Sequence, residues 1–104
     1  MSKVSEGISE PTLAELRASL DNLDAALVML LAERFKLTDR VGRLKKALRL
    51  PAADPEREAA QLSRIAGLAA ESGLAADLAV RILRLVIDEV VQRHGRIGRA
   101  GSAA

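Results

Sequence analysis

LAELRASLDNLDAALVMLLAERFKLTDRVGRLKKAL, residues 13–48, is the stretch that decides the fold of this 104-residue chain. Its apolar side chains recur at alternating steps of three and four residues, which is the spacing along one face of an α-helix. The stretch therefore predicts one long helix over about residues 12–48. The positions that carry the pattern are Leu13, Leu16, Leu20, Leu23, Leu27, Leu30, Leu37, Val41, Leu44 and Leu48.

Capping residues mark the two ends of this helix, and the helix is too long for the rest of one chain to cover. Thr12 and Glu15 have the spacing of a capping box at the start, and Pro51 follows the end. Such a helix spans about 55 Å at about 1.5 Å per residue, roughly twice the width of a small domain. The shorter helices that follow cannot cover its apolar face. We therefore expect a second copy of the chain to bury that face in a two-fold homodimer.

Two further helices are predicted after the long one. Asp54 as N-cap and Pro55 at the first helical position open the second, which ends at Ser72–Gly73. The third is expected over about residues 75–94, with Gly95 as its C-cap. The sequence thus predicts an all-α fold of one long and two shorter helices, intertwined with a second copy.

Domain boundaries follow from the same pattern. Residues 1–11 contain glycine, proline and small polar residues without periodicity, so they are interpreted as a flexible leader. Residues 12–95 form the predicted helical domain. Residues 96–104 are rich in glycine and alanine and are expected to be a disordered tail.

The composition narrows the class of protein. The chain has no cysteine, which favours a reducing compartment, and no uncharged run approaches the roughly 20 residues that span a bilayer. We expect a cytoplasmic protein without a membrane partner.

The net charge of +2 is too small to require nucleic acid as a partner. Arg93, Arg96 and Arg99 form a short basic cluster without stacking aromatics, interpreted as a solubilising end.

Arg34 does not fit the apolar face on which it lies. A guanidinium there must reach water, pair with a carboxylate, or face a cavity that holds an anion. Glu33 or Asp39 could be its salt-bridge partner, which is the alternative to a ligand. Lys45 lies about three turns further on, nearly on the same face. Arg17 is too distant to share a small ligand with Arg34 within one chain, but it could approach the middle of a partner's helix.

Together these residues resemble a known family. Residues 16–46, with the DPERE segment at 54–58, resemble the first helix and following loop of the all-helical, AroQ-class chorismate mutases. The family pattern is an Arg in the first turns, an LD pair, LLxxR, VGxxK and then DxxRE. The resemblance covers about residues 13–94. The matching residues here are Arg17, Leu23, Asp24, Leu30, Leu31, Arg34, Val41, Gly42, Lys45, Asp54, Arg57 and Glu58.

The resemblance implies the rearrangement of chorismate to prephenate in aromatic amino-acid biosynthesis. This unimolecular pericyclic reaction needs no nucleophile, metal or cofactor, so none is expected. A useful site clamps the two carboxylates of chorismate and directs donors at the breaking ether oxygen. By the resemblance, Arg34 and Arg57 of one chain and Arg17 of the other hold the carboxylates. Lys45 would contact a carboxylate and the ether oxygen.

The remaining site residues include a departure from the family. The resemblance assigns Glu58 as acceptor for the ring hydroxyl of the substrate, helped by the backbone amide of Asp54. Family members commonly carry a Ser and, four residues later, a Gln or Glu that donates to the ether oxygen. Here those positions are Val90, which can only pack, and His94. We hypothesise that His94 is catalytic, the alternative being a capping or surface role.

Other functions stay open at this point. Enzymes of the same fold remove pyruvate from isochorismate or rearrange amino-substituted chorismates, and the carboxylate clamp would serve them as well. Glu58 favours chorismate, because that substrate has a ring hydroxyl to bind. A different class is a non-catalytic helical dimerisation module, in which the basic side chains would be solvated or salt-bridged.

Overall fold

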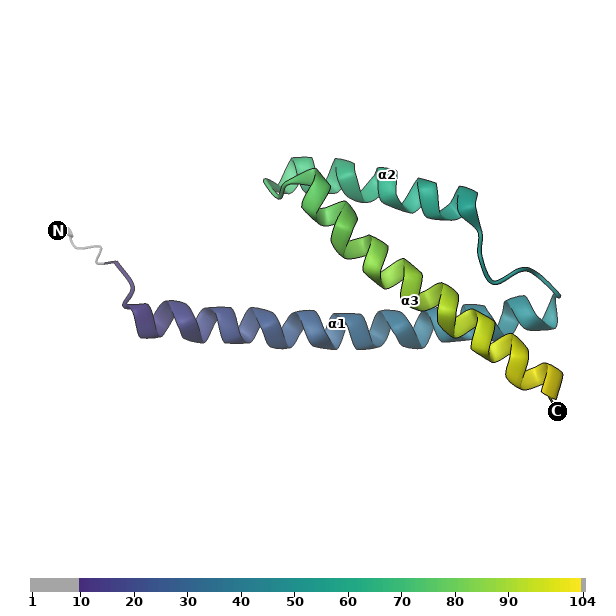
Figure 1. Ribbon diagram of the computed structural model, residues 1–104. Coiled ribbons are helices and arrows are strands. Elements are labelled where there is room, and N and C mark those ends of the chain that lie inside the picture. Colours follow the sequence, from purple (N-terminus) through teal and green to yellow (C-terminus); the bar gives the residue numbers. More distant parts are fainter. Residues whose placement is uncertain (1–9, 104) are drawn as a thin grey trace. The chain divides into compact units, whose positions relative to one another are not determined.

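The computed structural model describes residues 10–103, with side chains to residue 99. It contains the helices α1 (Leu13–Ala47), α2 (Pro55–Ser72) and α3 (Ala76–Ala103), shown in Figure 1. No strand occurs between residues 10 and 103. The prediction of an all-α chain with one long and two shorter helices is therefore confirmed. Most of the leader predicted at 1–11 lies outside the described residues.

The chain divides within α1 into two compact units, Met1–Arg34 and Phe35–Ala104. In the first unit the predicted capping box begins the helix. The Thr12 N–H donates to Glu15 Oε1 at 2.8 Å, and the Glu15 N–H donates to Thr12 Oγ1 at 3.1 Å. These two bonds satisfy backbone donors that the first turn leaves free, so the predicted start of α1 is confirmed.

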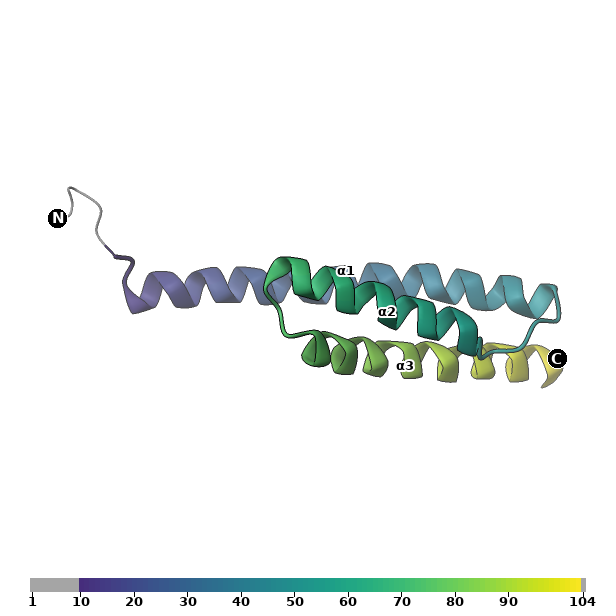
Figure 2. The ribbon, with the colours of Figure 1, turned by 90° about the horizontal axis from the view of Figure 1, so that it is seen from above.

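The second unit contains the end of α1 and the antiparallel pair α2 and α3, which lie side by side in Figures 1 and 2. Asp54 caps α2 as predicted, because its Oδ1 accepts from the Arg57 N–H at 3.1 Å. Gly73 ends α2 in the left-handed conformation, with φ of 83°. These caps fix where the DPERE segment begins and therefore where its side chains lie.

The predicted end of the third helix is wrong. α3 continues past Gly95 to Ala103. Glycine inside a helix costs about 1 kcal/mol relative to alanine but does not by itself end the helix. The residues beyond Gly95 also make contacts, since Arg96 Nη2 lies 3.3 Å from Glu89 Oε2 and Ile97 lies against Gly42. The domain boundaries, including the tail at 96–104, stay predictions.

The buried interior of the described chain is small. Its apolar members are Ala69, Ala79 and Ile87, and its polar member is His94. α1 contributes only Gly42, and the apolar side chains of its stripe from Leu13 to Leu44 are between 46% and 69% exposed, whereas Leu31 and Phe35 are half-buried. One copy of the chain therefore leaves the apolar stripe of α1 uncovered. None of the described helices is long and apolar enough to span a membrane, and the cytoplasmic location stays a prediction.

Candidate active site

Lys45 lies in the last turn of α1 and lines two pockets. Its Nζ donates to the carbonyl oxygen of Ala52 at 3.0 Å. It lines one pocket of about 420 Å³ together with Asp54, and another of about 430 Å³ together with His94. The structure thus brings Lys45 near two of the other predicted site residues, one from the loop before α2 and one from α3.

Glu58 is held by a residue that the sequence analysis missed. Its Oε1 accepts from Arg84 Nη1 of α3 at 3.2 Å, and the Glu58 side chain is only 20% exposed. Arg84 Nη1 also lies 3.6 Å from Asp88 Oδ1. The spacing of Arg84 and Asp88 on one helix was visible in the sequence, but the pair with Glu58 joins two helices. Arg57 is exposed beside Glu58 in the first turn of α2.

The side chain of His94, on α3, is buried against the last part of α1. Its Nε2 lies 2.7 Å from the carbonyl oxygen of Thr38, and its Nδ1 is buried without a hydrogen-bond partner among the described residues. Because a carbonyl oxygen only accepts, Nε2 must carry a proton. Nδ1 therefore carries one only when the ring is an imidazolium. The absence of a side chain at Gly42 lets the ring approach α1 so closely.

Three other predicted site residues have no side-chain hydrogen bond or ion pair with another residue of the described part of the chain. Val90 is half-buried on α3, one turn before His94, and Arg17 is exposed on α1. Arg34 is half-buried, and its Nη1 is buried without a hydrogen-bond partner among residues 10–99. Asp39, considered as a partner for Arg34, instead pairs with Arg93 at 3.0 Å.

Arg93 of α3 makes several contacts, two of which are with α1. Besides Asp39 it pairs with Glu89 at 3.1 Å, and its guanidinium lies 4.5 Å from the centre of the Phe35 ring. The hydrogen bond from Arg93 lowers the pKa of Glu89, and the same bond raises the pKa of Arg93. The ion pairs of Glu89 therefore stabilise the fold at pH values above the usual pKa range of a carboxyl group. This stabilisation is lost as the pH falls through the lowered pKa of Glu89. Since Arg93 and Arg96 are both ion-paired, they offer little free charge to nucleic acid.

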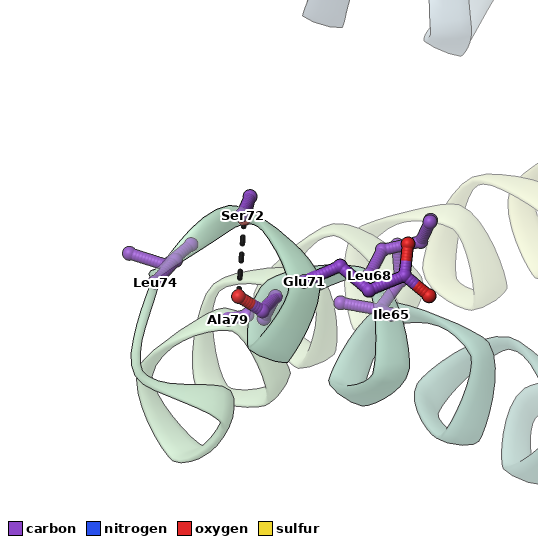
Figure 3. Close-up of a pocket in the computed structure, with 7 residues that line it drawn as sticks. Ile65, Leu68, Glu71, Ser72, Leu74 and Ala79 are labelled. Atoms are coloured by element: carbon purple, nitrogen blue, oxygen red, sulfur yellow. Dashed lines mark hydrogen bonds between the residues drawn. The ribbon is translucent and has the colours of Figure 1, made fainter.

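Another pocket, of about 540 Å³, lies where α2 turns into α3 (Figure 3). Glu71 is its one charged lining residue, and Ser72 Oγ donates to the Ala69 carbonyl oxygen at 3.1 Å. An apolar pocket whose one charge is negative does not suit a dianion. The described residues also contain no group of three or more His, Cys, Asp or Glu side chains that could hold a metal ion.

The described chain is all-helical, and the predicted cationic residue Lys45 lines two pockets at the end of α1. Residues 16–95 match the family model of chorismate mutase type II. The chain belongs to the chorismate mutase type II family. The prediction of a chorismate mutase, an isomerase of aromatic amino-acid biosynthesis, is confirmed by this match, and the alternative functions are not favoured.

Individual relatives agree with the family. The chorismate mutase of Methanocaldococcus jannaschii is 34% identical over 76 residues, which cover 73% of this chain and 77% of that protein. The T-protein of Enterobacter agglomerans is 40% identical over 77 residues, or 74% of this chain and 21% of that protein. The bifunctional chorismate mutase/prephenate dehydratase of Escherichia coli K12 is 36% identical over 83 residues, or 80% and 22%. The chain thus spans about a fifth of the last two proteins.

Proposed function

We propose that two copies of the chain form an intertwined homodimer, and that each of its two sites converts chorismate to prephenate with Arg17 supplied by the other copy. The apolar stripe of α1, at least 46% exposed at each large side chain, supports this assembly. Burying apolar surface contributes about 25 cal/mol per Å², so a stripe of this length favours association. A second α1 carries the complementary stripe, because a two-fold interface pairs a surface with itself.

The observation that carries the proposed site is the buried Nη1 of Arg34, which has no hydrogen-bond partner in the part of the chain that the structure describes. An arginine donor that is removed from water and lacks an acceptor is destabilising unless a ligand supplies one. A substrate carboxylate fits this need, because it accepts two parallel hydrogen bonds from a guanidinium. Arg57 and the other copy's Arg17 would bind the remaining carboxylate oxygens. Holding both carboxylates favours the compact conformation in which the two ends of chorismate can react.

Lys45 and His94 would act at the ether oxygen. As the ether C–O bond breaks and the new C–C bond forms, negative charge grows on this oxygen and no proton has to be transferred. A nearby ammonium or imidazolium stabilises that charge more in the transition state than in the ground state, which is the condition for a faster reaction. The shared pocket of Lys45 and His94 supports these roles.

The proposed role of His94 predicts that its replacement slows the reaction. While Nε2 donates to Thr38, His94 can donate to substrate only through Nδ1, which requires the imidazolium. His94→Leu removes this donor, so we expect kcat/KM for chorismate to fall about 10²-fold. His94→Gln supplies a neutral amide donor and should recover part of the loss. A His94→Leu enzyme as active as the wild type would refute the catalytic role of His94.

Arg84 is proposed as a positioning residue for Glu58. Replacing it by methionine removes the 3.2 Å contact that orients the carboxylate, so we expect KM to rise about tenfold with a smaller change in kcat. Arg84→Lys should recover part of the loss. Arg81→Met is the matched control, because the ion pair that Arg81 makes within residues 10–99 is with the exposed Asp77 at 3.7 Å. Equal kinetics for the Arg84→Met and Arg81→Met variants would argue against the role.

A mixing experiment tests the dimer and the shared site together. Arg17→Ala and Arg34→Ala homodimers should each be nearly inactive. If the two sites each combine Arg34 of one copy with Arg17 of the other, a mixed dimer regains one intact site. Refolding the variants together at equal amounts should then restore about a quarter of wild-type activity. A mixture that forms dimers but stays as inactive as its parents would overturn the proposal.

A further inference from the structure

Arg93 and His94, neighbours on α3, contact one face near the end of α1. Each residue of this contact face lies three or four positions from two of the others, which is the spacing along one side of a helix. Lys45 follows one turn after the last of them. The contact face therefore ends beside a residue of the proposed site. Its members are Phe35 and Asp39, which contact Arg93, and Thr38 and Gly42, which contact His94.

The guanidinium of Arg93 is held from three directions. Its Nη1 donates to Asp39 Oδ2 at 3.0 Å, and its Nε donates to Glu89 Oε2 at 3.1 Å. The centre of the Phe35 ring lies 4.5 Å from Arg93 Cζ. A planar fork of donors has few orientations that satisfy two carboxylates and a ring together. Arg93 therefore fixes both the distance and the rotation of this part of α3 relative to the contact face.

The ring of His94 depends on the same placement. Its Nε2 lies 2.7 Å from the Thr38 carbonyl oxygen, and a Cβ on Gly42 would lie 2.6 Å from its Cδ2. The ring thus contacts the backbone of α1, which cannot follow it as a flexible side chain could. A shift of α3 by about 1 Å away from α1 would lengthen the contact with Thr38 beyond the range of a hydrogen bond.

Stability alone does not account for the pair of Arg93 and Asp39. The two side chains are 34% and 31% exposed, and ion pairs in contact with water add little to folding because solvent screens them. Glu89 does not require Arg93 either, since Arg96 also pairs with it. What the pair with Asp39 adds is a fixed direction between two helices. A side chain that acts in a reaction needs such support from the residues around it.

We propose that Arg93 is a positioning residue that acts on the reaction through His94. Its ion pair with Asp39 fixes α3 against the contact face, and this placement keeps the His94 ring on the Thr38 carbonyl. Arg93 itself touches no substrate. The inference rests on the proposed function of His94 and adds the pair of residues that holds the ring in place.

The single histidine makes the placement of the ring testable by NMR. In untagged, ¹⁵N-labelled protein, the Nε2–H proton of His94 is expected as a separate signal, protected from exchange by its bond to Thr38. Asp39→Asn keeps the size of the side chain and removes its charge, so it should shift this signal and shorten its protection. Arg93→Met should do the same. A signal that is unchanged in both variants would overturn the proposal.

Steady-state kinetics test the consequence for the reaction. Asp39→Asn and Arg93→Met should each lower kcat for chorismate about tenfold and change KM less than about threefold, because neither residue contacts the substrate. Rates are expressed per folded protein, measured by circular dichroism. Arg93→Lys keeps the charge beside Asp39 and should recover part of the rate. Wild-type kcat in both Asp39→Asn and Arg93→Met, whatever the NMR signal, would refute a role in the reaction.

Arg96→Met is the matched control. The contact that Arg96 makes within residues 10–99 is with Glu89 of its own helix, at 3.3 Å, so this substitution removes an arginine of α3 without releasing α1. It should leave both kcat and the His94 signal unchanged. A loss of kcat as large as that of Arg93→Met would mean that charge on α3, and not the pair with Asp39, is responsible.

His94→Leu distinguishes the positioning role from the proposed function. If Arg93 acts through His94, adding Arg93→Met to His94→Leu should lower kcat by less than about a further twofold. A full further tenfold loss would reject the positioning role and leave the role of His94 standing. Wild-type activity of His94→Leu alone would instead refute the catalytic role of His94, and the NMR signal would still decide whether the pair holds the ring.

Discussion

Arg34→Ala is expected to lower kcat/KM for chorismate by about 10²- to 10³-fold, because it removes a preorganised donor to a substrate carboxylate. The same substitution should not lower the melting temperature. Nη1 of Arg34 is buried and has no hydrogen-bond partner among the described residues, so shortening the side chain removes no hydrogen bond that the structure shows for this atom. Loss of activity with unchanged stability is the signature of a binding group that has no structural role.

The measurement combines a chorismate assay with thermal unfolding followed by circular dichroism. Arg40→Ala is the matched control, since Arg40 lies exposed on the same helix and carries the same charge. It should keep nearly full activity. Arg34→Lys keeps the charge but not the planar pair of donors, so it should recover only part of the rate. An active Arg34→Ala enzyme, or one that is inactive because it unfolds, would contradict the assignment.

Local patterns in the sequence were enough to predict the helices. The periodicity after Thr12, the capping box with Glu15, and Asp54 before Pro55 concern neighbouring residues, and the structure confirms each of them. Arg34 was also identified locally, because it interrupts an apolar face. Such features depend on contacts within a turn or two of helix, which the order of residues determines directly.

The contacts between helices could not be predicted in the same way. Arg84 with Glu58, Arg93 with Asp39, and His94 with Thr38 each join residues that are distant in the chain. Every helix offers several arginines and carboxylates, so the sequence leaves many pairings possible. The end of α3 was misjudged for a related reason. Gly95 looked like a cap because the contacts of the residues beyond it were not visible.

The fit between Gly42 and His94 leads to the largest expected effect on stability. A Cβ at position 42 would lie 2.6 Å from His94 Cδ2 and 3.0 Å from Ile97 Cδ1. The ring cannot move aside without losing its 2.7 Å contact with the Thr38 carbonyl. We therefore expect Gly42→Ala to lower the free energy of unfolding by about 1–3 kcal/mol, the usual cost of overpacking. Denaturant unfolding of the protein at fixed concentration measures it.

Gly67→Ala is the control for the effect of glycine on the helix itself. A Cβ there would meet nothing within 4 Å, so alanine should stabilise the protein by about 0.5–1 kcal/mol through helix propensity. When Gly42→Ala is combined with His94→Ala, the methyl group at position 42 no longer meets the ring. The changes in the free energy of unfolding caused by the two substitutions should therefore not add. A coupling energy of about 1 kcal/mol or more would place the clash at the ring. Strict additivity, or a Gly42→Ala protein as stable as Gly67→Ala, would mean that the ring does not pack against α1 in solution.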